Sequence, residues 1–279
     1  MSLCVHTGNA VSMGGGLWPF LACLLIALSS GPLGVFLILR RMTLMADGLS
    51  HGLLPGAAIA GAFFGHSLLA LHLMGFSVAL GLACVTTWFA HRSILGTDAV
   101  FSGFALWAMA AGLLIYRECD HHMHLLTGSI IGVHLTMVAV MAVVCAITLF
   151  FCWRSHRALI LSCFDPMFFL MQGGKPQNTE MVFLIVLTLN LMIAFQVLGT
   201  LMGLAFVILP ALTMRILSDR IHHMCYGAIA IGILASVFGL IVLGTTSDRS
   251  GTGIVFIMGC IYGCALVYER LCWKGRAGT

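Results

Sequence analysis

Three long runs of this chain contain neither Lys nor Arg, and they constrain its fold more than any other feature. The runs cover residues 17–39, 181–201 and 225–243. Each reaches the ~20 residues that an α-helix needs to cross the hydrocarbon core of a bilayer. Only 8% of the 279 residues are charged and 61% are hydrophobic, whereas a soluble domain usually carries about 25% charged residues. We therefore predict an all-α integral membrane protein.

The charged residues and the cysteines argue against several other classes of protein. The net charge is +4, but the basic residues are dispersed between apolar runs, so nucleic acid is not an expected partner. Most of the eleven cysteines lie inside apolar runs and no CxxC pair occurs, which argues against a zinc ribbon or a thioredoxin-like motif. No Lys or Arg precedes the first run, which is also too long for a signal-peptide core, so we expect a retained span.

The hydropathy pattern predicts a polytopic helical bundle of about nine membrane spans. Eight are possible, because the sixth and seventh runs almost touch at Gly199-Thr200. No soluble domain fits between the runs, so residues 1–279 are expected to form one transmembrane domain whose longest polar break is 154–180. The expected spans are 17–39, 44–64, 67–90, 97–116, 129–152, 180–199, 201–217, 225–245 and 253–270.

The distribution of Lys and Arg predicts the orientation, since cytoplasmic loops carry the excess of these residues. With the amino terminus outside and nine alternating spans, Arg117 and Arg249 lie outside. The other eleven basic residues then lie inside: Arg40, Arg41, Arg92, Arg154, Arg157, Lys175, Arg215, Arg220, Arg270, Lys274 and Arg276. The carboxyl terminus and the 154–180 segment are therefore expected in the cytoplasm.

Helix-breaking residues occur within several of the apolar runs. Gly31-Pro32, Pro55-Gly56 and Pro210 are the clearest cases. Inside a membrane such residues are tolerated where protein or a water-filled cavity satisfies the freed backbone groups. Several of them in one chain favour a transporter over a simple anchor.

Asp47 and His51 are the most informative pair of ionisable residues. They are four residues apart, so a helix would place both on one face. A carboxylate and an imidazole so placed form half of a coordination site for zinc, manganese or iron. Apolar residues follow at once, and ionisable groups at that depth normally face a bundle interior or a cavity. A helix-end Asp beside a hydrogen-bonded His is the alternative, because two ligands do not complete a metal site.

The residues around this pair resemble the signature of the metal-ion ABC permease family, the membrane subunits of zinc, manganese and iron importers. The family pattern is approximately G-P-L-G-x-F-x-x-x-R-R-M-x-x-x-x-D-x-x-S/A-H-x-x-x-P/L-G. This chain has Gly31-Pro32-Leu33-Gly34-Val35-Phe36, Arg40-Arg41-Met42, Asp47, Ser50-His51 and Pro55-Gly56 in the same order and spacing. Four further segments are similar to family motifs: 126–133, Phe164-Asp165-Pro166, 196–213 and Asp219-Arg220.

The resemblance, which runs from about residue 17 to 270, implies a permease subunit of an importer for a divalent metal ion. It places Asp47 and His51 on the translocation path. It implies three partners besides the lipid bilayer: an ABC ATPase subunit, an extracytoplasmic metal-binding protein and a second copy of the chain, forming a homodimer. The chain contains no G-x-x-x-x-G-K-[ST] phosphate loop, so ATP hydrolysis is expected in the partner and this subunit is not an enzyme. The resemblance also implies the bacterial cytoplasmic (inner) membrane, with the metal ion as cargo and no permanently bound cofactor.

Residues 165–173 match the short cytoplasmic helix by which the family docks on its ATPase. The residues implied in this contact are Asp165, Pro166, Phe168, Phe169 and Gly173. The family usually has an acidic residue after the Pro and small residues in this helix, whereas this chain has Met167-Phe168-Phe169. The docking surface is therefore expected to be more apolar than usual. The alternative is an interfacial helix that lies on lipid.

The loop 117–124 is a second candidate metal site, expected outside the membrane. Its potential ligands are Cys119, Asp120, His121, His122 and His124. The alternative is a polar loop whose histidines meet headgroups or the partner binding protein. His222-His223 is expected in a solvated cytoplasmic turn.

Two other functions stay open from the sequence. One is a permease for a metal chelate such as haem or a siderophore, although those relatives have ten spans and lack the Asp–His pair. The other is a haem-binding electron-transfer subunit, which would need histidines at matched depth, and mid-span histidines are scarce here. The residues do not choose between zinc, manganese and ferrous iron.

Overall fold

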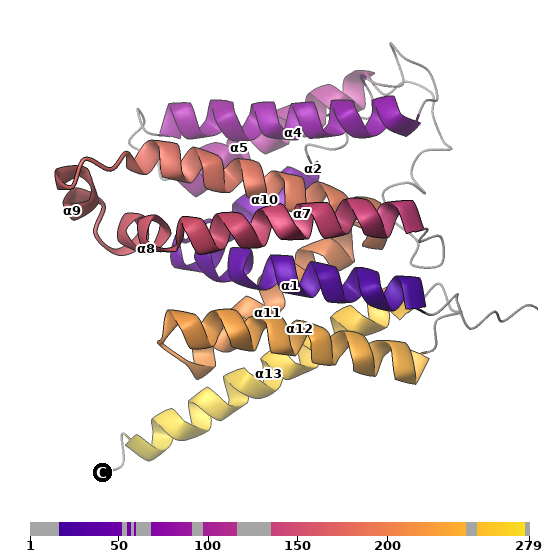
Figure 1. The fold of residues 1–279 in the computed structure, drawn as a ribbon, viewed down its shortest axis with the longest axis vertical. Helices are drawn as coiled ribbons and strands as arrows, with labels where there is room; N and C mark the ends of the chain where they lie inside the picture. Colours follow the sequence, from indigo (N-terminus) through magenta and orange to yellow (C-terminus); the bar gives the residue numbers. More distant parts are fainter. Residues whose placement is uncertain are drawn as a thin grey trace, which may run out of the picture.

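The structure is a computed structural model that describes residues 17–51, 55–56, 59, 68–90, 97–115, 135–243 and 250–276. All regular elements in these ranges are α-helices, as the composition predicts (Figure 1). They are α1 (Leu17–Leu39), α2 (Thr43–His51), α4 (Leu68–Ala90), α5 (Thr97–Ile115), α7 (Leu135–Arg154), α8 (His156–Phe164), α9 (Pro166–Met171), α10 (Pro176–Leu198), α11 (Thr200–Leu217), α12 (Ile221–Leu243) and α13 (Ser250–Arg276).

The prediction of about nine spans, and the alternative of eight, is wrong. Within the described ranges, six helices are long and apolar enough to cross a membrane. They are Trp18–Leu39, Leu135–Arg154, Pro176–Leu198, Thr200–Leu217, Ile221–Ile241 and Gly251–Leu271. The prediction of a helical membrane bundle is confirmed. The predicted orientation, with the amino terminus outside, was counted from nine alternating spans and no longer follows from the number of spans.

The difference arises in the second, third and fourth predicted spans. Where the sequence predicts one helix over 44–64, the described helix α2 covers Thr43–His51, and nine residues are far short of the ~20 needed. The described apolar parts of α4 and α5, Leu73–Phe89 and Asp98–Ala111, are also shorter than a full span. Within the described residues, none of these three helices is therefore long and apolar enough to cross a membrane.

Gly199 separates the sixth and seventh predicted helices. Its φ of 89° and ψ of 162° end α10, and α11 begins at Thr200. Residues that carry a side chain rarely adopt this backbone conformation, whereas glycine adopts it at little energetic cost. Beyond the turn, Gly203 lies directly against Phe195, so α11 packs on the end of α10 as a separate helix.

Helix α1 lies at the centre of the bundle. It packs against α7, α11 and α12, and Figure 1 shows it between α7 and α12. Its second half joins α2, α5 and α10 in one apolar core that includes Phe36, Phe101 and Phe183. Its first half joins α7, α11, α12 and α13 in another. The two cores together fix α1, and with it the position of α2.

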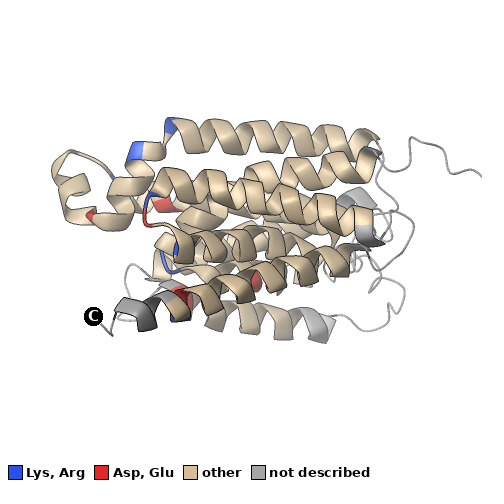
Figure 2. Cartoon of the chain, turned by 90° about the horizontal axis from the view of Figure 1, so that it is seen from below, with Lys and Arg blue, Asp and Glu red and all other residues tan. Residues whose placement is uncertain are grey.

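Charged residues gather at one end of the bundle. Figure 2 shows this at the end that carries α9. Seven of the described basic residues lie there, each at or near the end of a helix: Arg40, Arg41, Arg154, Arg157, Lys175, Arg215 and Arg220. The remaining surface of helices such as α7 is apolar, with Val143, Phe150 and Trp153 exposed. This is the surface that a lipid-embedded bundle presents.

Candidate functional site

Helix α2 starts from a tight turn at the end of α1. Arg40, Arg41 and Met42 donate their N–H groups to carbonyls of the last turn of α1, and Arg41 has a φ of 58°. Helix α2 then packs on α5 and α10. The carboxyl group of Asp98, at the start of α5, faces the backbone of Leu44 and Met45 in the first turn of α2. A carboxylate at that end of a helix is favoured by the positive end of the helix dipole.

The structure places both residues of the predicted metal pair on α2. Asp47 is exposed, while its neighbours Ala46 and Gly48 are buried. His51 is the last residue of the helix, one turn from Asp47. Their shared face follows from the helical spacing. Their role in ion passage stays a prediction.

The other predicted metal ligands belong to the loop 117–124. All five of them lie outside the described residues: Cys119, Asp120, His121, His122 and His124. Within the described ranges, no group of three or more His, Cys, Asp or Glu side chains could hold a metal ion. Any ion bound through α2 would therefore take its other ligands from water, a second copy or residues beyond these ranges.

A buried polar cluster beside α2 was missed by the sequence analysis. Arg40 donates from Nη2 to Ser162 Oγ on α8 at 2.7 Å, and its guanidinium lies 5.0 Å from the ring centre of Phe183 on α10. Glu180, only 7% exposed, lies one turn before Phe183. Arg40, Ser162 and Glu180 line a cavity of about 520 Å³, together with Arg41 and Arg215. A carboxylate in the first turns of an apolar helix is the signal that could have revealed this cluster.

The segment predicted to dock on an ATPase forms a short helix, α9. Asp165 is its N-cap and accepts a hydrogen bond from the Phe168 N–H at 2.9 Å. Pro166 occupies the first helical turn, where its missing N–H costs nothing. Gly173, with a φ of 81°, turns the chain toward α10. Helix α9 is six residues long.

The surface of α9 is apolar. Met167, Phe168, Leu170 and Met171 are all exposed, and Phe169 is half-buried. The exposed side chains of α9 are thus apolar, as the sequence indicates. That this segment binds an ATPase stays a prediction. The preceding helix α8 is anchored by Leu159, which is fully buried. Burial also raises the pKa of the Cys163 thiol on α8, so this thiol stays protonated near neutral pH.

His222 and His223 differ from the expected solvated turn. Both lie in the first turn of α12. Both side chains are exposed, and the ring of His222 lies 4.9 Å, centre to centre, from that of His156 on α8. Burial and the neighbouring His222 lower the pKa of His156 below its usual value, because both disfavour the charged ring.

These features define a polytopic membrane protein whose helices carry a short exposed helix at the charged end. The model of the ABC 3 transport family matches residues 17–269, and the chain belongs to that family. The "Probable iron transport system membrane protein" of Haemophilus influenzae is 27% identical over 90% of this chain and 92% of the relative. The "Manganese transport system membrane protein MntC" of Listeria monocytogenes is 26% identical over 87% and 86%.

The fold is also similar to solved structures. The structure "PsaBC from Streptococcus pneumoniae in complex with Fab" superposes with a TM-score of 0.74, at 24% identity, over 88% of this chain and 89% of that one. At this identity the likeness supports the arrangement of helices and nothing finer.

Proposed function

We propose that this chain is the membrane-spanning permease subunit of an ABC importer for a divalent transition metal ion. The family match over residues 17–269 carries the proposal. Relatives that cover almost the whole chain are named as manganese or iron transport proteins. Asp47 and His51 suit manganese, ferrous iron and zinc alike, so the relatives favour manganese or ferrous iron as the cargo.

In this proposal Asp47 and His51 contact the ion as it passes. Asp47 is exposed while the rest of α2 is held against α5 and α10, so the backbone that carries this carboxylate is fixed. Two ligands per chain bind more weakly than a closed four-ligand cage. Weak binding suits transport, because a transported ion must also leave.

The charged end of the bundle faces the cytoplasm in this proposal, because cytoplasmic surfaces carry the excess of Lys and Arg. Helix α9 then docks on the ATPase subunit through Asp165, Pro166, Phe168, Phe169 and Gly173, within the segment 154–180 of a single permease domain. The complete importer contains two copies of this chain, two ATPase subunits and an extracytoplasmic metal-binding protein, in a bacterial inner membrane. The metal is cargo and not a resident cofactor.

The decisive experiment is metal uptake by a bacterium that lacks its own importers. The chain is expressed with its cognate ATPase and binding protein, and accumulation of manganese, iron and zinc is followed. We expect uptake of manganese or iron, and its loss in Asp47→Ala and His51→Ala. Asp219→Ala is the control, since this exposed carboxylate lies between α11 and α12 and is not one of the predicted metal ligands.

Each result has a clear meaning. Uptake that survives both α2 substitutions would remove Asp47 and His51 from the path while keeping the importer. Loss of uptake in Asp219→Ala as well would mean that the assay reports folding or membrane level. Absence of uptake for every metal, with all subunits present in the membrane, would refute the proposed cargo.

A further inference from the structure

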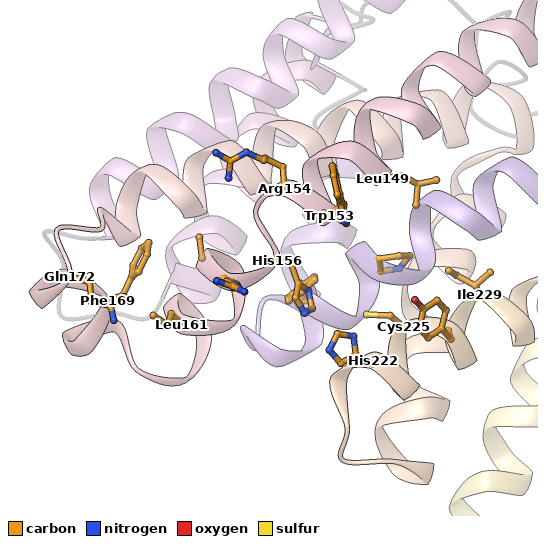
Figure 3. Close-up of a pocket in the computed structure, with 16 residues that line it drawn as sticks. Leu149, Trp153, Arg154, His156, Leu161, Phe169, Gln172, His222, Cys225 and Ile229 are labelled. Atoms are coloured by element: carbon orange, nitrogen blue, oxygen red, sulfur yellow. The ribbon is translucent and has the colours of Figure 1, made fainter.

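A second cavity, of about 850 Å³, opens at the charged end of the bundle on the side away from α2. Helices α7 and α12 both pack on α1 and have little contact with each other. The buried residues Pro32 and Phe36 of α1 line the cavity, and so do Leu149 of α7 and Ile229 of α12. Figure 3 shows Leu149, Cys225 and Ile229 on the side of the cavity opposite Leu161, Phe169 and Gln172. The interior is therefore apolar and bounded by membrane-spanning helices.

The mouth of the cavity is basic. Arg154 ends α7, and Arg157 lies one residue into α8; both side chains are exposed and line the cavity. Figure 3 shows His156 and His222 close together between the basic end and the apolar interior. Among the described residues that line the cavity there is no Asp or Glu. The described part of the mouth thus presents positive charge and hydrogen-bond donors.

The cavity also lies where lipid headgroups would be. Helix α7 is a candidate span that ends at Arg154, so both arginines fall at the end of a membrane-crossing segment. Trp153 and Tyr226, which line the mouth, are 79% and 73% exposed. Trp and Tyr concentrate at the membrane–water interface. The exposed apolar side chains Ile147 and Phe150 of α7 continue from the mouth toward the bilayer core.

We propose that this cavity binds one anionic phospholipid. Its phosphate contacts Arg154 and Arg157, and an acyl chain lies along Leu149 of α7 and Ile229 of α12. Basic pockets between membrane helices recognise anionic headgroups, and the cavity has the size of typical ligand sites, about 300–1,000 Å³. A metal cation is disfavoured by the two arginines. A second copy is disfavoured because a twofold interface here would bring like charges together.

Native mass spectrometry of the full chain in an uncharged detergent tests the proposal. Phosphatidylglycerol and phosphatidylcholine of equal chain length are added in parallel, and retained lipid is counted. We expect the native chain to prefer phosphatidylglycerol. In the double variant Arg154→Gln, Arg157→Gln this preference should fall about tenfold, as expected when charge-assisted phosphate contacts are lost. Arg270→Gln, an exposed arginine outside the cavity, should keep it.

A second variant tests the acyl-chain part of the site. Ile229→Trp fills the apolar wall, and we expect it to reduce retention of both lipids while the arginines remain. Unchanged thermal stability confirms that each variant is folded. Equal retention of phosphatidylglycerol by the native chain and the arginine double variant would overturn the proposal.

Two further outcomes would also overturn it. If millimolar inorganic phosphate displaces phosphatidylglycerol while Ile229→Trp changes nothing, the site binds a free anion and not a lipid. If the chain retains no lipid but forms dimers that the arginine variants strengthen, the groove belongs to a second copy. The readout needs neither metal nor ATPase, so its failure is distinguishable from failure of the proposed import function.

Discussion

At Gly34, helices α1 and α11 pack so closely that the methyl group of an alanine should push them apart. A Cβ built at Gly34 of α1 would collide with the carbonyl oxygen of Val207 on α11 and lie 3.1 Å from the Cβ of Ala211. The first obstacle is helix backbone, which cannot rotate away as a side chain would. We therefore expect Gly34→Ala to force α1 and α11 apart.

The size of the effect follows from two opposing contributions. Replacing Gly by Ala within an unobstructed helix stabilises it by about 1 kcal/mol. Overpacking a close-packed interior costs about 1–3 kcal/mol, and a backbone obstacle favours the upper part of that range. The net cost is about 2 kcal/mol, or roughly a 5 °C lower unfolding temperature. Gly81 on α4 is the matched control, because a Cβ there meets nothing within 4 Å.

Thermal unfolding of the purified chain in detergent, followed by loss of the folded peak in size-exclusion chromatography, measures both variants. Gly34→Ala should unfold at a lower temperature than the native chain, whereas Gly81→Ala should unfold at the same or a slightly higher one. Equal unfolding temperatures for all three would refute the tight α1–α11 approach. A lower value for both variants would mean that Ala is poorly tolerated for a reason other than this contact.

Three further predictions concern the charged end. In a double-mutant cycle of Arg40→Gln and Ser162→Ala, we expect a coupling free energy of unfolding of about 1–2 kcal/mol, because the hydrogen bond between the two side chains is charge-assisted. A coupling free energy near zero would contradict the 2.7 Å contact. Asp165→Ala removes an N-cap hydrogen bond that contributes about 1 kcal/mol to helix stability. The backbone amides of α9 should therefore exchange faster with deuterium, while exchange rates in the rest of the chain stay the same. Unaltered exchange in α9 would contradict this. His156 has a lowered pKa in the folded chain, so the unfolded chain binds more protons and stability should fall as the pH drops through about 6.5. His156→Gln should flatten that slope and exposed His223→Gln should not; equal slopes would argue against His156.

The apolar runs predicted the long helices closely. Helices α1, α10, α11 and α12 lie within a few residues of the runs that predicted them, because an uncharged stretch of that length has few alternatives to a membrane helix. The run over 44–64 is different. Its hydropathy is continuous, but the described helix there, Thr43–His51, is too short to count as a span. Hydropathy measures transfer to lipid and carries little information about the exact bounds of a helix.

The sequence was also uneven as a guide to the candidate site. Asp47 and His51 could be placed on one helix because their relation depends on local spacing alone. The contacts of Arg40 could not be predicted in the same way. Its partner Ser162 is 122 residues away, and Phe183 lies on yet another helix. Such contacts depend on how α1, α8 and α10 pack, which periodicity does not determine.

The position of Arg40 bears on how the two halves of the candidate machinery are connected. Arg40 directly follows α1 in the turn that leads into α2, and its side chain donates a hydrogen bond to α8, the helix that precedes α9. Arg41, with its positive φ, holds the turn between α1 and α2 in a conformation with little freedom. A displacement of α8 relative to α1 is therefore expected to break the Arg40–Ser162 hydrogen bond or to move the turn before α2. The side chain of Arg40 thus links α8, which precedes the predicted docking segment, to the turn that precedes the helix that bears Asp47.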